Sequence, residues 1–385
     1  MKTDWEKIRE DFPVTKRCAY FISAGMSPLP EPVFKTLTEE YRKLLVEGDL
    51  HYEEDVKRGD ALSADLAACL NTAADNVTFG PNTSTVMSLL ALSFRERAPR
   101  PFNVVSLLDE FPSSTIGFEH LGIEMRYARP LEGRYAVESV INTTNNETLA
   151  VVASYVQYAT GFRLELGSLG RALRGRGILF IVNATQGFPF FPIDVEAMHI
   201  DALSASLHKW GMTGHVGALF YTSPAFRQTF PSPLAGWLSV HGECGEFIHT
   251  AKNAPFRIHA SAKQYNLGTS NLQALLAFQT SFNYLKEIGW ENIRLRIAEL
   301  TDYLIAGLRR LGIAIVSPVA SREERSAIVS FTLGEGNDRL VEALASRDIH
   351  VSFRNGLIRV SLNIFNDFSD IDCLLGALNQ TVRTE

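Results

Sequence analysis

The sequence has few cysteines and no pattern in their positions. Its 385 residues include Cys18, Cys69, Cys244 and Cys373, which lack the close spacing of metal ligands and do not suggest a disulfide framework. We therefore expect no metal site and a reducing compartment. The N-terminal segment is charged and has no apolar core, so no signal peptide is expected and a cytoplasmic location is the default.

Long apolar runs and an excess of basic residues are also absent. No uninterrupted apolar run is long enough to cross a membrane. The formal net charge is −6 at pH 7, so the chain as a whole does not attract nucleic acid or an anionic membrane. We expect neither as a partner. With 46% hydrophobic residues, the composition is that of a globular protein with a large core and about two domains.

Short apolar segments alternate with amphipathic ones through the first part of the chain. Segments 103–108, 148–156 and 178–184 are typical of strands, and 83–97 is typical of a helix. Such alternation predicts an α/β fold, in which helices cover a mostly parallel sheet and functional residues follow the carboxyl ends of strands.

The pattern changes after Gly268. Two long amphipathic helices are expected in 270–312, followed by a strand, a helix, two further strands and a final helix. We therefore predict a large domain at residues 20–275. A smaller α+β domain is predicted at residues 276–385, with residues 1–19 packed on it.

A lysine stands directly after one of the predicted strands. The sequence Ala-Leu-Ser-Ala-Ser-Leu-His-Lys predicts a strand that ends near Ser206, followed by His208 and Lys209. A lysine in an apolar pocket near an anion loses its proton more readily and becomes nucleophilic. An ordinary surface lysine is the alternative. Twenty-six residues before this lysine, the preceding strand ends at Asn183, with Gln186 close behind.

Two segments predict a backbone site for an anion. In 77–94 a strand and a Gly-Pro turn lead into a helix that begins near Thr83 and Ser84. The free amides and the dipole at a helix start favour phosphate. An ordinary helix cap made by one of the two hydroxyls is the alternative. Segment 266–271, which contains Thr269, has a similar character and opens another helix.

Further candidate side chains follow strands or interrupt them. Phe111, after a strand, would present an aromatic face, although a core position is the alternative. Tyr158, after another strand, is placed to donate to a phenolic oxygen. Arg359 interrupts an alternating strand that should be half buried, so its charge needs a carboxylate from the protein or from a ligand. Together the candidates supply what pyridoxal phosphate (PLP) needs: a lysine, phosphate donors, an aromatic stacker and polar partners for the ring.

In order and spacing, these motifs resemble the class V aminotransferase family, the cysteine desulfurase-like group of fold-type I PLP-dependent enzymes. The resemblance runs from Tyr-Phe-Ile-Ser-Ala-Gly to Ile-Arg-Val-Ser-Leu-Asn, and Ser-Leu-His-Lys is its most specific motif. It implies PLP as cofactor, a Schiff base on Lys209 and a homodimer with shared active sites. By the same resemblance, Thr83, Ser84, Ser206 and His208 bind the phosphate, Thr269 reaches the neighbouring subunit's phosphate, Phe111 stacks on the ring, Gln186 contacts the phenolic oxygen, and Arg359 binds the substrate carboxylate.

Two features depart from the family pattern. Desulfurases that store sulfur as a persulfide carry a cysteine shortly before the arginine motif, whereas 348–361 has none, and Cys373 is expected to be a core residue. The partner of the ring nitrogen is normally Asp but here is Asn183. A carboxylate raises the pKa of that nitrogen and makes the ring a stronger electron sink, whereas an amide has no charge. Asn183 should therefore disfavour transamination more than elimination, unless another group protonates the ring.

We accordingly expect a PLP-dependent enzyme that acts on a small amino-acid substrate through an external aldimine. A lyase that breaks a C–S or related bond at the β or γ carbon, without a persulfide cysteine, is favoured. In it the released Lys209 is the general base and acid. An aminotransferase or epimerase is the second hypothesis. A PLP-binding protein without turnover is the third.

Overall fold

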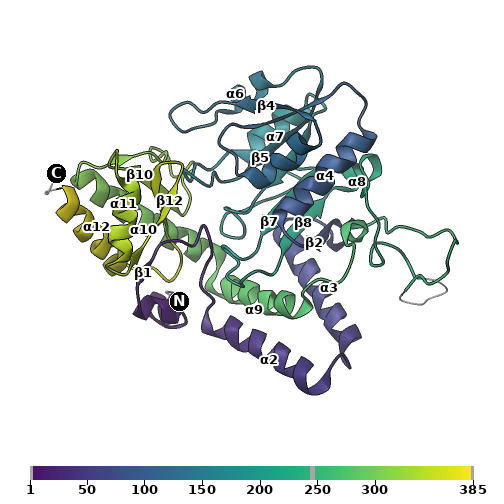
Figure 1. Cartoon of the computed structure of the whole chain (residues 1–385), viewed down its shortest axis with the longest axis horizontal. Helices are drawn as coiled ribbons and strands as arrows, with labels where there is room; N and C mark the ends of the chain where they lie inside the picture. Colours follow the sequence, from purple (N-terminus) through teal and green to yellow (C-terminus); the bar gives the residue numbers. More distant parts are fainter. Residues whose placement is uncertain (1–2, 243–247, 383–385) are drawn as a thin grey trace.

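The computed structural model describes residues 3–242 and 248–382. A larger part surrounds a seven-stranded sheet, and a smaller part at the C-terminal end surrounds a four-stranded sheet (Figure 1). No helix within these ranges is long and apolar enough to span a membrane.

The large sheet has the strand order β2-β8-β7-β6-β5-β3-β4. Its strands are β2 (Val77–Gly80), β3 (Asn103–Leu107), β4 (Glu124–Ala128), β5 (Thr148–Ser154), β6 (Leu179–Asn183), β7 (Ala202–Ser206) and β8 (Ala218–Thr222). Strands β7, β6, β5, β3 and β4 run parallel, and β8 is antiparallel to both of its neighbours. The expected mostly parallel sheet is confirmed. Because β2 therefore runs in the same direction as β7, its carboxyl end lies at the same edge of the sheet.

The central strands are buried on both faces, which accounts for their continuous apolar sequences. On one face, Val152 of β5 and Ile181 of β6 pack with α4 (Thr83–Arg97). On the other face, the adjacent Val151 packs with α7 (Leu166–Arg174). Helices on both sides thus hold the strand ends that carry the candidate residues.

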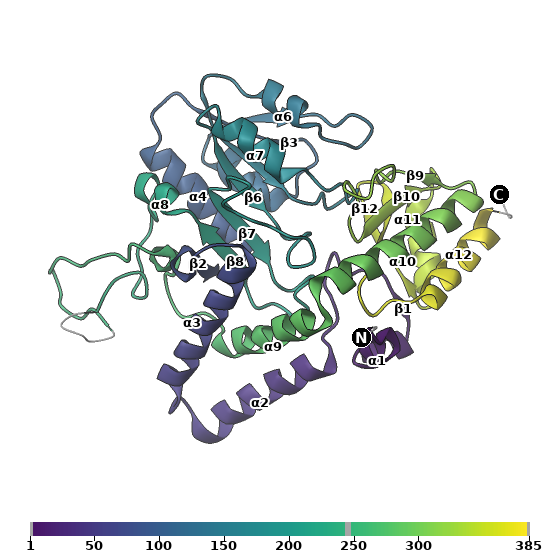
Figure 2. The same ribbon diagram turned by 180° about the vertical axis from the view of Figure 1, so that it is seen from behind.

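The other helices complete both parts of the molecule. They are α1 (Trp5–Glu10), α2 (Glu31–Glu47), α3 (Tyr52–Cys69), α5 (Ile116–His120), α6 (Val137–Thr143), α8 (Pro224–Thr229), α9 (Leu272–Ile288), α10 (Trp290–Arg310), α11 (Asn337–Ala345) and α12 (Phe368–Val382). Helix α10 runs from the large part to the small one (Figure 2). Its early residues Ile293 and Ile297 join the core of the large part, and Leu300 and Leu304 join that of the small part. The domain boundary expected near residue 275 stays a prediction.

The small part contains two sheets. The antiparallel sheet β12-β13-β10-β9 consists of β9 (Ala314–Ile315), β10 (Ile328–Thr332), β12 (Ser352–Arg354) and β13 (Leu357–Ser361), while β1 (Ala19–Tyr20) pairs in parallel with β11 (Ile349–His350). Strand β13 was expected to be longer and half buried. It is instead buried on both faces from Ile358 onward and ends at Ser361, because a turn follows in which Asn363 N donates to Asn366 Oδ1.

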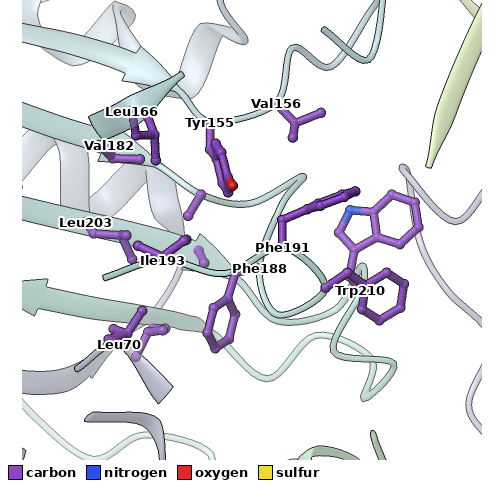
Figure 3. Close-up of a cluster of buried hydrophobic side chains, with 14 of the residues drawn as sticks. Leu70, Tyr155, Val156, Leu166, Val182, Phe188, Phe191, Ile193, Leu203 and Trp210 are labelled. Atoms are coloured by element: carbon purple, nitrogen blue, oxygen red, sulfur yellow. The ribbon is translucent and has the colours of Figure 1, made fainter. Parts of the chain in front are cut away.

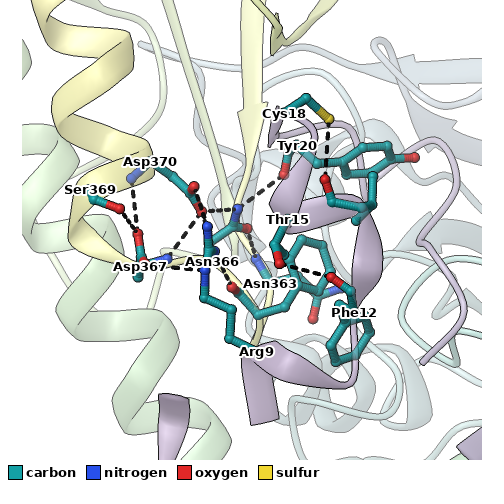
Figure 4. A network of polar contacts seen from close by, with 12 residues as sticks. Arg9, Phe12, Thr15, Cys18, Tyr20, Asn363, Asn366, Asp367, Ser369 and Asp370 are labelled. Atoms are coloured by element: carbon teal, nitrogen blue, oxygen red, sulfur yellow. Dashed lines mark hydrogen bonds and ion pairs between the residues drawn. The ribbon is translucent and has the colours of Figure 1, made fainter. Parts of the chain in front are cut away.

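The N-terminal segment packs against the start of α12 (Figure 4). The guanidinium of Arg9 donates to both carboxylate oxygens of Asp370 at 2.8 Å and to the Phe365 carbonyl at 2.6 Å. Asn366 donates to Asp370 and to the Tyr20 carbonyl. These contacts link the first residues of the chain to its last helix.

Candidate active site

The candidate residues meet at the carboxyl edge of the large sheet. Asn183 ends β6 and Ser206 ends β7, while Phe111 and Tyr158 follow β3 and β5. Lys209 comes three residues after the end of β7. Because β3, β5, β6 and β7 are neighbours in the sheet, their ends bring these side chains into one region.

The amine of Lys209 lies above an aromatic ring. Its Nζ is 5.3 Å from the ring centroid of Phe111, whose side chain is 41% exposed. Burial, together with Arg359 and Arg354, lowers the pKa of Lys209 to about 8. Loss of water and the neighbouring positive charges both disfavour the ammonium form. A large fraction of this side chain is therefore the nucleophilic, neutral amine in mildly alkaline solution.

Packing holds the backbone beside this lysine. The next residue, Trp210, is buried in an aromatic and aliphatic cluster at the end of the sheet (Figure 3). Its indole donates to Gln186 Oε1 at 2.9 Å, and Gln186 Nε2 donates to the Ala24 carbonyl at 2.9 Å. Both ends of the Gln186 amide thus bind the protein itself. The expected contact of Gln186 with a phenolic oxygen stays a prediction.

The start of α4 is capped by Asn82. Its Oδ1 accepts a hydrogen bond from the Thr85 amide at 2.8 Å, so neither Thr83 nor Ser84 makes the cap. Ser84 is exposed in the first turn, and Thr83 is buried. The first amides of a helix have no partner within it, and its dipole favours an anion there.

Neutral hydrogen-bonding groups adjoin this helix start. Thr83 Oγ1 lies 2.9 Å from Ser206 Oγ and 3.4 Å from Thr185 Oγ1. The Ser206 amide donates to Thr185 Oγ1 at 3.0 Å. Burial and the adjacent Lys209 lower the pKa of His208 to about 4, so its imidazole is neutral at pH 7. The three hydroxyls therefore lie beside the helix dipole, and His208 follows two residues after Ser206, an arrangement that suits a phosphate.

Both ends of the Asn183 amide are engaged. Oδ1 accepts from the Thr185 amide at 3.1 Å, and Nδ2 donates to Ser114 Oγ at 3.0 Å. Because a backbone amide can only donate, the oxygen of Asn183 must face Thr185, which settles the orientation of the side chain. The hydrogen that remains on Nδ2 is the donor that Asn183 can offer to a ligand.

Ser114 connects Asn183 to a buried carboxyl group. Glu110 accepts hydrogen bonds from the Ser154 amide at 2.6 Å, the Ser154 hydroxyl at 2.5 Å and Gln157 Nε2 at 3.1 Å, and also from Ser114. Burial raises the pKa of Glu110, and these hydrogen bonds oppose that rise. Neither Glu110 nor Ser114 was among the residues expected from the sequence, although both lie in the same segment as Phe111.

Arg359 is a buried cation without a carboxylate. Its Nη1 donates to the Tyr158 carbonyl at 2.7 Å, Nη2 lies 3.5 Å from Ser352 Oγ, and Nε has no partner. Burial and the nearby Arg354 lower its pKa to about 10, so it remains charged at pH 7. Arg359 forms no ion pair with a carboxylate of the described residues. A buried charge without a partner is costly, so this group suits an anionic ligand.

A tight hairpin occupies the segment before Arg359 where the family resemblance would place a cysteine. Strands β12 and β13 are joined by Asn355 and Gly356, whose φ angles of 51° and 77° agree with a type I′ turn. Tyr158 donates to Asn355 Oδ1 at 3.0 Å, and its ring lies 5.2 Å from that of Phe111. The Asn-Gly pair is a strong sequence signal for such a hairpin, from which this turn could have been predicted.

Thr269 lies apart from these groups. It is exposed and lines a cavity of about 570 Å³ with Trp237, His241 and His259, and no residue around Lys209 contributes to that lining. Its expected role in a neighbouring subunit's site stays a prediction. Within residues 3–242 and 248–382, no group of three or more His, Cys, Asp or Glu side chains could hold a metal ion.

Cys373 is exposed, so the expectation of a core position was wrong. Helix α12 buries Ile371 and Leu374, and Cys373 falls between them on the side that faces solvent. Burial raises the pKa of the partly buried Cys69 to about 11, which disfavours its thiolate. Cys244 lies outside the described residues.

The geometry fits PLP. The α4 start with its hydroxyls suits the phosphate, the half-covered face of Phe111 suits the ring, and Lys209 suits the aldehyde. The unpartnered Nε of Arg359 suits a substrate carboxylate. When bound, PLP supplies an electron sink for a carbanion at the substrate's α carbon.

Comparison with known sequences agrees with this geometry. The chain belongs to the aminotransferase class-V family, which it matches over residues 19–374, and it is therefore a PLP-dependent enzyme. It is 23% identical to a probable cysteine desulfurase from Pyrococcus abyssi, with 98% of each chain covered. It is 25% identical to another from Streptomyces coelicolor, with 97% of this chain and 96% of that protein covered.

Solved structures share the whole fold. An apo cysteine desulfurase from Thermococcus onnurineus NA1 matches with a TM-score of 0.90 at 20% identity, covering 100% of this chain and 99% of that one. The cystine C–S lyase C-DES, solved with its product cysteine persulfide, matches with a TM-score of 0.83 at 19% identity, covering 96% and 99%. The expected fold-type I architecture is confirmed.

Proposed function

We propose that this protein is a PLP-dependent lyase that eliminates a sulfur-linked or related substituent from the β or γ carbon of an amino acid. The observation that carries this proposal is the hydrogen bonding of the Asn183 side chain. Its Oδ1 and one Nδ2 hydrogen bind Thr185 and Ser114, so it can offer a ligand only the second Nδ2 hydrogen, which is a neutral donor. Such a partner does not enforce protonation of the ring nitrogen. A weaker electron sink penalises transamination, which needs a long-lived carbanion, more than an elimination in which a leaving group departs as the proton is removed.

Lys209 supplies the acid–base chemistry in this proposal. With a pKa of about 8, its amine can take the proton from the α carbon and return it to a leaving group. Arg359 binds the substrate's α-carboxylate. The rings of Phe111 and Tyr158, which contact each other, lie between Lys209 and Arg359 in the series of contacts. In this proposal, Thr83, Ser84, Ser206 and His208 also bind the phosphate, and Gln186 and Tyr158 contact the phenolic oxygen.

The proposal includes a homodimer in the cytoplasm. Thr269 is exposed beside a cavity and has no role in its own chain's site, which supports a contact with the phosphate of a second subunit. The scattered cysteines support a reducing compartment.

Product analysis tests the proposed reaction. Purified holoenzyme with S-substituted cysteines should release an α-keto acid and ammonia without any added α-keto acid. Turnover only after an α-keto acid is added would instead identify an aminotransferase. Conversion to the D-amino acid would identify an epimerase, and a complete lack of turnover would support the non-catalytic alternative.

Exchange of any one cysteine for serine should leave at least about half of the turnover, since a thiolate is not required. The hairpin before Arg359 contains no cysteine, and the raised pKa of Cys69 disfavours its reactive form. The four variants, at Cys18, Cys69, Cys244 and Cys373, are compared by product formation at equal PLP content. Loss of turnover in one of them, with fold and PLP retained, would contradict the proposed absence of a persulfide step.

A further inference from the structure

Two arginines share one face of the β12–β13 hairpin. In the register of this hairpin, Ser352 lies opposite Arg359, and Arg354 lies opposite Leu357. Opposed residues of an antiparallel pair project from the same face, and so do alternate residues along one strand. Arg354 and Arg359 are therefore diagonal neighbours on one face. Two like charges in this arrangement repel each other unless an anion lies near them.

The part of the chain that the structure describes provides no such anion. Arg354 Nη1 donates to the adjacent Phe353 carbonyl at 2.7 Å, and no carboxylate pairs with Arg354 or Arg359. Arginines elsewhere in the structure do have carboxylate partners. Examples are Arg9 with Asp370, Arg58 with Glu40 and Arg325 with Asp302.

The tip of the hairpin borders the candidate site through a series of contacts. Asn355, next to Arg354, accepts the hydrogen bond from Tyr158. The ring of Tyr158 meets that of Phe111, over which Lys209 lies. The positive charge of Arg354 also contributes to the lowered pKa of Lys209. Arg354 is thus a third cation at this site, and it is exposed where Arg359 is buried.

We propose that Arg354 binds a second anionic group at the far end of the substrate's side chain. The enzyme would then select amino acids whose leaving group carries a carboxylate or a comparable acid. Arg359 is deep enough to hold the α-carboxylate, and Arg354 stands at the rim, where a distal group arrives. The α-carboxylate alone would neutralise only one of the two arginines. This inference rests on the proposed lyase function.

A matched pair of ligands tests the charge requirement. S-Carboxymethyl-L-cysteine and S-carbamoylmethyl-L-cysteine have nearly the same shape and the same sulfur, and differ in the charge of the distal group. Binding to the holoenzyme is measured as the change in the absorption spectrum of bound PLP during titration. We expect the carboxylate to bind about tenfold more tightly, an effect between those of exposed and buried ion pairs.

Variants assign that preference to one side chain. Arg354→Gln should remove the preference and leave the affinity for the carbamoyl compound unchanged, while Arg354→Lys should keep part of the preference. Arg339→Gln is the matched control, because Arg339 is an exposed arginine on α11 and its loss changes the net charge equally. It should keep the full preference.

The remaining outcomes separate this inference from the proposed function. Equal binding of the two compounds by the wild-type enzyme, or a preference that persists in Arg354→Gln, would overturn the inference and leave the lyase proposal standing. Equal weakening of both compounds in Arg354→Gln would show that both arginines share the α-carboxylate, which also overturns it. If no amino acid changed the PLP spectrum, both proposals would fail.

Discussion

Replacement of Lys209 by alanine should abolish the covalent attachment of PLP and lower turnover by a factor on the order of a thousand or more. The amine lies over Phe111, and its lowered pKa supplies the neutral form that attacks an aldehyde. Borohydride reduction followed by peptide mapping locates the linkage. Lys286→Ala, at an exposed position on α9, is the control and should retain it.

The same side chain should give PLP capture a characteristic pH dependence. Only the neutral amine reacts, so the rate at which the apoprotein binds PLP covalently should rise with pH and level off above about 8. At pH 8 about half of Lys209 is neutral, against less than about 1% of an ordinary lysine. A rate that continues to rise beyond pH 10, or a pyridoxyl group mapped to another lysine, would contradict the assignment.

The sheet and the residues at its edge could be predicted from local sequence. Strands β3, β5 and β6 are largely apolar because helices bury both of their faces. Short apolar runs of this kind are visible in the sequence. Asn183 ends β6, and Phe111 and Lys209 come shortly after β3 and β7, so their meeting at one edge of a parallel sheet followed from the fold class alone.

The connections between these residues could not be predicted in the same way. The contact between Ser114 and Asn183 joins positions 69 residues apart, and the sequence contains no sign of which polar groups will be partners. The exposure of Cys373 depends on the rotation of α12 about its axis, where one position in the helical period changes the side that a residue faces. The relation of Arg354 to Arg359 depends on the register of the β12–β13 hairpin, which places both side chains on one face.

Asn183→Asp should raise the pKa of the pyridine nitrogen by about one to three units, because a carboxylate favours the protonated ring. The stronger electron sink should then increase the half-transamination side reaction relative to elimination by about tenfold, which is the equivalent of one pKa unit in free energy. Two measurements check this: the ¹⁵N NMR shift of labelled PLP, which reports protonation of the ring nitrogen, and the ratio of pyridoxamine phosphate to elimination product.

The neighbours of Asn183 set the size of this effect. An aspartate there would still accept the hydrogen bond from the Thr185 amide, but its second oxygen would face Ser114, which already binds the buried Glu110. The hydroxyl of Ser114 can donate to only one carboxylate at a time, and two nearby carboxylates disfavour each other's ionisation. Part of the new charge should therefore be lost to protonation of one of the acids.

A second variant separates these contributions. Glu110→Gln removes the competing charge while keeping one oxygen that can accept the hydrogen bond from the Ser154 amide. The double variant with Asn183→Asp should therefore show a higher pKa of the ring nitrogen, and more transamination, than Asn183→Asp alone. Glu110→Gln by itself should leave the partition close to that of the wild type. If the partition and the ¹⁵N shift stay unchanged in both aspartate variants, with PLP bound, residue 183 does not control the electronic state of the ring.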